Sequence, residues 1–115
     1  MGVVYHPNYL LYFEPGRTER MRAAGAAYAD LERRGVFLVV TEARCRYRGA
    51  ARYDETLTIA TRVEEVGKAS VRFSTRVSGP DGRLLCEGDV SLASVDRSMS
   101  PVRLPADVAA LLEKA

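Results

Sequence analysis

The residues best suited to chemistry lie near the start of the sequence, in the stretch GVVYHPNYLLYFEPGR. Tyr5 and His6 directly precede Pro7, and proline suits the first position of a helix, where its missing N–H is not needed. The unpaired N–H groups of a helix start can receive an oxygen that gains negative charge during a reaction. The His6 imidazole is a separate candidate, as a general base. The alternative is that His6 only packs or caps the helix, with Asn8 as the other candidate cap.

Glu14 is the next candidate, because it places a carboxylate on the same predicted helix. A carboxylate of this kind can act as a general base in catalysis. The alternative is that Glu14 is solvated or pairs with Arg17, three residues further along the helix.

Two helices are predicted before the strands. Apolar residues at helical spacing predict a first helix that begins at Pro7 and stops at Gly25. Pro15 and Gly16 predict a kink or a break within it, because an interior proline removes a hydrogen bond and crowds the carbonyl four residues back. A second, short helix is predicted over residues 27–34.

Residues 36–95 are predicted to form antiparallel strands. Apolar and polar residues alternate in TEARCRYR, TLTIATRV and SVRFSTRV, which is typical of half-buried strands, and a last strand covers about residues 84–95. The stretches VGKAS and SGPDGR predict hairpin turns. A C-terminal helix then begins at Pro105. Inward-facing positions are predicted at Thr41, Ala43, Cys45, Tyr47, Leu57, Ile59, Thr61, Val63, Val71, Phe73, Thr75, Val77, Val108, Leu111 and Leu112.

One long helix followed by an antiparallel meander predicts an α+β domain. A sheet that curls around the helix satisfies both, because the helix needs an apolar surface and each strand offers one apolar face. The alternative is a flat sheet with the helix laid across it.

Composition narrows the class of protein. A chain of 115 residues is the size of one domain, and its net charge of +2 is too small to predict nucleic-acid binding. We find no signal-peptide pattern and no segment of membrane-spanning length. Cys45 and Cys86 are expected to be reduced strand residues, and with one histidine they make no recognisable metal set. We therefore expect a cytoplasmic protein without metal, nucleic-acid or membrane partners.

The opening stretch MGVVYHPNYLLYFEPGRTERMRAAG resembles the first motif of hotdog-fold acyl-CoA thioesterases of the 4-hydroxybenzoyl-CoA thioesterase type, which include the Tol-Pal-associated enzymes. GVFLVV, ARYDETLTIATRV and VDRSMSPVRLP are similar to later blocks of the same pattern, so the resemblance covers essentially residues 1–115. It implies a single hotdog domain that hydrolyses an acyl-CoA to a carboxylic acid and free CoA. It also implies a homodimer or homotetramer with sheets paired edge to edge, sites between subunits, and no cofactor beyond the coenzyme A of the substrate.

The same resemblance assigns roles to individual residues. The backbone N–H of His6 is expected to polarise the thioester carbonyl, with Tyr5, His6 and Glu14 as candidate catalytic residues. Glu14 enters by analogy with a second hotdog lineage that carries a glutamate on its central helix. Candidate substrate-binding residues are Lys68, Ser70 and Arg72 for the phosphates of coenzyme A, and Phe37 and Val39 for the acyl group.

One position of the family motif has no counterpart in the sequence. The family's catalytic aspartate would fall just before Met1. We therefore expect a domain that lacks the start of its first strand. The alternative function is a non-catalytic acyl-CoA-binding module with the same fold. A hydratase is a third hypothesis, but it would need a histidine–aspartate pairing that we do not find.

Overall fold

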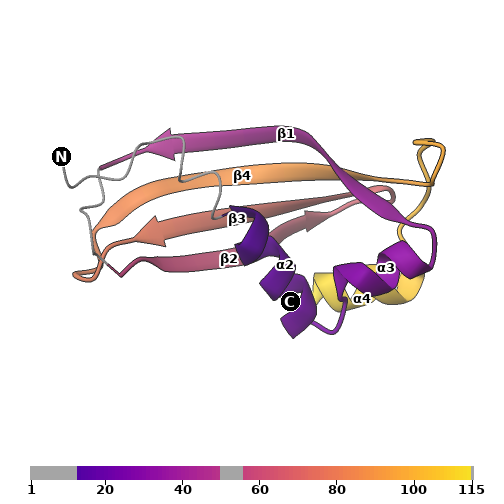
Figure 1. The fold of residues 1–115 in the computed structure, drawn as a ribbon, viewed down its shortest axis with the longest axis horizontal. Helices are drawn as coiled ribbons and strands as arrows, with labels where there is room; N and C mark the ends of the chain where they lie inside the picture. The colour runs from indigo at the N-terminus through magenta and orange to yellow at the C-terminus, as the bar shows by residue number, and fades with distance from the viewer. Residues whose placement is uncertain (1–12, 50–55, 115) are drawn as a thin grey trace.

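The computed structural model describes residues 13–49 and 56–114, and it confirms the α+β class (Figure 1). Its helices are α2 (Phe13–Ala23), α3 (Tyr28–Arg33) and α4 (Ala106–Glu113). Its strands are β1 (Phe37–Tyr47), β2 (Thr58–Val66), β3 (Ser70–Ser78) and β4 (Leu84–Val95). Tyr5 and His6 lie outside the described residues. No helix in the described part of the chain is both long and apolar enough to cross a membrane.

The four strands form one antiparallel sheet in the order β1-β4-β3-β2. Strands β2, β3 and β4 follow one another as the predicted meander, joined by the two predicted hairpin turns. Strand β1 departs from a simple meander, because it pairs with β4 at the opposite side of the sheet from β2. The chain must therefore cross from one edge of the sheet to the other between β1 and β2.

The core lies between the helices and the inner face of the sheet. Helix α2 packs on β2 and β3, and α4 packs on β2. The alternation predicted for β3 is confirmed, since Val71, Phe73, Thr75 and Val77 are all buried. Burying one large apolar side chain stabilises a fold by about 1.5–3 kcal/mol, so this row anchors the sheet to α2.

The predicted break at Pro15 and Gly16 does not occur, because Phe13–Ala23 forms one continuous helix. Pro15 is the third residue of the described helix, and the carbonyl that its missing N–H would have bonded, on residue 11, lies outside the described residues. Gly16 also has a packing reason, because a Cβ on it would come within 2.4 Å of the Thr61 hydroxyl. The helix therefore approaches β2 closely at this point.

The predicted inward face of β1 is largely exposed. Thr41, Ala43 and Tyr47 are exposed and Cys45 is half-buried, because β1 lies at the edge of the described sheet and α2 lies over β2 and β3 instead. A shift of register between Val40 and Glu42 also interrupts the alternation.

The C-terminal helix is close to its prediction. Val108 and Leu112 are buried as expected, but Leu111 is 36% exposed. Leu104, just before the helix, is buried instead, and its N–H donates to the carbonyl of Lys68 at 2.9 Å. This bond ties the segment that leads into α4 to the β2–β3 turn.

Candidate active site

An apolar groove of about 370 Å³ opens where α3, the start of β1 and the end of β4 meet. Phe37 and Val39, predicted to line an acyl pocket, both line it. The guanidinium of Arg97 lies 5.4 Å from the centre of the Phe37 ring, a distance typical of a cation–π contact. The full lining is Tyr28, Phe37, Leu38, Val39, Asp96, Arg97 and Met99.

Met99 and the Asp96 loop were not predicted as part of the site. The Asp96 carboxylate accepts hydrogen bonds from the N–H groups of Ser98, at 2.8 Å, and Ser100, at 3.0 Å. This turn holds Met99 at a φ of 65° with its side chain exposed. The DRS stretch signals a turn, but only the folded chain brings that turn beside Phe37.

A second hollow of about 200 Å³ lies against helix α2. It shares Tyr28 and Leu38 with the apolar groove, so the two spaces adjoin. The Tyr28 hydroxyl lies 3.2 Å from the carbonyl oxygen of Leu38 and 3.3 Å from its backbone nitrogen, which fixes the phenol between them. The lining of this second hollow is Glu14, Arg17, Thr18, Met21, Tyr28, Leu38 and Leu92.

Glu14 and Arg17 supply the charge of this second hollow. Glu14 is exposed, whereas Arg17 is half-buried. Burial lowers the pKa of Arg17, and the charges of Glu14 and Tyr28 oppose that effect. An arginine keeps its proton in proteins, so the hollow presents a fixed cation beside a carboxylate.

The predicted phosphate-binding residues follow one another around the β2–β3 turn, but one of them is already paired. Arg72 forms an ion pair with Glu65 at 3.1 Å and approaches Asp89 at 4.0 Å. Lys68 and Ser70 are exposed. A shallow hollow of about 90 Å³ joins Glu65, Ser70, Val71, Arg72 and Ser91. A phosphate bound by Arg72 would have to compete with Glu65.

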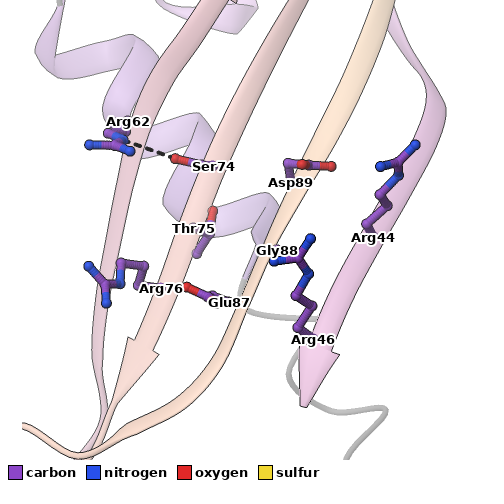
Figure 2. Close-up of a pocket in the computed structure, with 9 residues that line it drawn as sticks. All are labelled: Arg44, Arg46, Arg62, Ser74, Thr75, Arg76, Glu87, Gly88 and Asp89. Atoms are coloured by element: carbon purple, nitrogen blue, oxygen red, sulfur yellow. Dashed lines mark hydrogen bonds between the residues drawn. The ribbon is translucent and has the colours of Figure 1, made fainter. Parts of the chain in front are cut away.

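The outer face of the sheet carries a more polar hollow, of about 290 Å³ (Figure 2). It lies on the face turned away from α2, where Arg44, Arg46, Arg62 and Arg76 surround the two carboxylates of β4. Glu87 lies opposite both Arg46 and Arg76 in the strand register. This outer hollow is larger than the hollow beside α2, yet none of the predicted catalytic or substrate-binding residues line it. We therefore do not assign it as the active site. Its lining is Arg44, Arg46, Arg62, Ser74, Thr75, Arg76, Glu87, Gly88 and Asp89.

The structure thus brings some predicted residues together and separates others. Phe37 and Val39 share the apolar groove, and Glu14 lines the adjoining hollow. Lys68, Ser70 and Arg72 line neither space. Within residues 13–49 and 56–114, no group of histidine, cysteine, aspartate and glutamate side chains is arranged to hold a metal ion.

Comparisons with known proteins agree with this architecture. A model of the thioesterase-like superfamily matches residues 1–112. The chain is 36% identical to the acyl-CoA thioesterase YbgC of Haemophilus influenzae, over 95% of this chain and 81% of that protein. It is 33% identical to the acyl-CoA thioester hydrolase YbgC of Escherichia coli O157:H7, over 95% and 82%. The crystal structure of DHNA-CoA thioesterase from Staphylococcus aureus superposes with a TM-score of 0.91 at 28% identity, covering 99% of this chain and 79% of that one. The predicted hotdog fold is confirmed.

Proposed function

Because the chain belongs to the thioesterase-like superfamily, we propose that it hydrolyses an acyl-CoA thioester to a carboxylic acid and free CoA. The observation that carries the proposal is the family match over residues 1–112, together with relatives whose names state this reaction. The apolar groove beside α3 supports it, because an acyl group needs an apolar pocket and this one adjoins a hollow that contains a carboxylate.

In this proposal the acyl chain occupies the groove lined by Phe37 and Val39. Glu14 supplies a carboxylate near the thioester, where it acts as the general base toward water. The backbone N–H of His6 stabilises the oxyanion, with Tyr5 beside it, and both residues precede the described helix. Lys68, Ser70 and Arg72 bind the phosphates of coenzyme A, because cations and hydroxyl donors suit phosphate oxygens.

We also propose that the protein acts as a homodimer or homotetramer. Strand β1 is an edge of the described sheet, and two of its large apolar side chains, Val40 and Tyr47, are 52% and 47% exposed. The edge of a sheet that carries exposed apolar side chains favours pairing with a second chain. Light scattering on the purified protein should give a mass that is a multiple of the 12.7 kDa chain, and a monomer would contradict this part of the proposal.

The test of the reaction is the release of free thiol from a panel of acyl-CoAs with short, long and aromatic acyl groups. We expect turnover well above the uncatalysed rate. A chain that binds CoA esters but releases no thiol would overturn the hydrolase proposal and favour a binding module.

A groove variant separates the reaction from the place where it occurs. Val39→Phe fills part of the groove, so we expect kcat/KM for long or aromatic acyl-CoAs to fall by about tenfold or more. Acetyl-CoA is the internal control, because its acyl group is too small to reach the added ring. An equal loss for every acyl-CoA, or no loss at all, would place the acyl group elsewhere without contradicting hydrolysis.

A further inference from the structure

The two cysteines lie side by side in the sheet, although 41 positions separate them in the sequence. Cys45 on β1 lies opposite Gly88, and Cys86 on β4 lies opposite Tyr47, so the two residues are diagonal neighbours on adjacent antiparallel strands. Their Sγ atoms are 2.8 Å apart. A disulfide bond is about 2.05 Å long, so these atoms need to approach by less than about 1 Å.

We propose that Cys45 and Cys86 form a redox modification site, in which hydrogen peroxide converts the two thiols to a disulfide that ties edge strand β1 to β4. This inference does not depend on the proposed thioesterase activity. It concerns two side chains that line none of the four hollows described above.

The surroundings of the two sulfurs give them different parts in the reaction. The Cys45 side chain is only half-buried, so peroxide can reach its sulfur, whereas Cys86 is fully buried. Burial first, and the hydrogen bond with Cys45 second, raise the pKa of Cys86 to about 12. The thiolate is the form that attacks peroxide, so Cys45 reacts first and Cys86 is held beside it as the second thiol.

The chemistry balances in two steps. The Cys45 thiol first loses its proton, and the thiolate attacks one oxygen of hydrogen peroxide. The O–O bond breaks, the leaving hydroxide takes up that proton as water, and Cys45 becomes the sulfenic acid. The Cys86 sulfur then attacks the Cys45 sulfur, the S–O bond breaks, and hydroxide leaves with the thiol proton as a second water. Overall, two thiols lose one electron per sulfur, and peroxide is reduced to two waters.

The position of the pair suggests what the bond would change. β1 is joined to the described sheet through β4, and its first residues line the apolar groove. A covalent link at Cys45 would hold the other half of the strand in register with β4. We therefore expect oxidation to slow amide hydrogen exchange along β1, while the β2–β3 hairpin serves as the internal reference.

The experiment uses the full chain, treated with hydrogen peroxide, denatured, and alkylated with N-ethylmaleimide before intact-mass measurement. We expect the untreated protein to take two alkyl groups, and the treated protein to take none and to have lost two hydrogens. Dithiothreitol should restore both alkylation sites. The peptides containing Cys45 and Cys86 should be linked in a non-reducing digest.

Variants identify the order of events. In Cys86→Ala, we expect Cys45 to be captured by dimedone as a sulfenic acid, whereas in Cys45→Ala the buried Cys86 should stay alkylatable after the same treatment. Three results on the wild-type protein would overturn the proposal. One is that both thiols persist at a dose that fully oxidises glutathione. The others are a disulfide between two chains on a non-reducing gel, and Cys45 oxidised to the sulfinic acid without a cross-link.

Discussion

At the scale of single residues, the hollow against α2 combines groups of opposite charge that face the same space. Glu14 and Arg17 are one turn apart on α2, and Tyr28 closes the hollow from α3. A carboxylate that lines such a hollow can accept a proton from water. This is the physical reason for preferring Glu14 among the described carboxylates.

The substitution Glu14→Gln tests this role directly. It keeps the size of the side chain and removes its basicity, so we expect kcat/KM for acyl-CoA hydrolysis to fall by about 100-fold or more. Glu19→Gln is the matched control, because Glu19 lies on the same helix and pairs with Arg22 at the surface. The control should keep its activity within about twofold, and a fully active Glu14→Gln enzyme would exclude Glu14 as the base.

At the scale of elements, Gly88 explains how closely helix and sheet approach one another. A Cβ at this position would come within 2.0 Å of the carbonyl oxygen of Arg44 and 2.8 Å of the Phe13 ring. The first is a backbone atom of the neighbouring strand and cannot move without disturbing the β1–β4 pairing. The second atom belongs to the first described residue of α2, so a glycine at position 88 leaves room for the Phe13 ring against β4.

The substitution Gly88→Ala should therefore weaken the fold. We expect the free energy of unfolding to fall by about 2 kcal/mol or more, since forcing an extra carbon into a filled space typically costs 1–3 kcal/mol. Chemical denaturation followed by circular dichroism measures the change. Gly49→Ala is the control, because its Cβ would meet only ordinary contacts, the nearest at 3.6 Å from Leu85. Equal stability of the two variants would mean that β1 and α2 move apart at little cost.

The elements themselves were largely predictable, because alternation and turn signals are local properties of the sequence. Strand β3 follows the alternation along its whole length, since the helices cover one face of that part of the sheet. The burial of β1 could not be predicted in the same way. Its sequence alternates too, but burial depends on which strands the helices cover, and α2 lies over β2 and β3.

The residues of the candidate site also differ in whether local sequence could identify them. Phe37 and Val39 were named as acyl-group candidates from a block of the family pattern, and both line the apolar groove, but their role in binding an acyl group stays a prediction. Tyr28 and Met99 were missed, because each reaches the groove only through contacts distant in sequence, with Leu38 in one case and the Asp96 turn in the other. The roles of Tyr5, His6 and Glu14, and of the turn residues Lys68, Ser70 and Arg72, stay predictions.

At the scale of the whole molecule, an ion pair joins the segment just after α3 to helix α4. The guanidinium of Arg34, just after α3, donates to both carboxylate oxygens of Asp107 in the first turn of α4, at 2.9 and 3.0 Å. The two residues are 73 positions apart, so the pair links helices that precede and follow the entire sheet (Figure 1). The hydrogen bond from Arg34 lowers the pKa of the Asp107 carboxyl below its ordinary value of 3.8.

The pH dependence of this link follows from the direction of that shift. A carboxyl whose pKa is lower in the folded than in the unfolded chain contributes stability above about pH 3.8, and the contribution disappears as the pH falls through the lower, folded value. Asp107→Asn should therefore lower the Tm at neutral pH, by a few degrees at most because the pair is exposed, and the deficit should vanish in strong acid.

Differential scanning fluorimetry of the wild type, Asp107→Asn, Arg34→Gln and the double variant measures the coupling between the two residues. The coupling should weaken as salt is added, because exposed charges are screened. A coupling that persists unchanged from neutral pH to well below the pKa of Asp107 would show that packing, and not charge, holds α3 and α4 together.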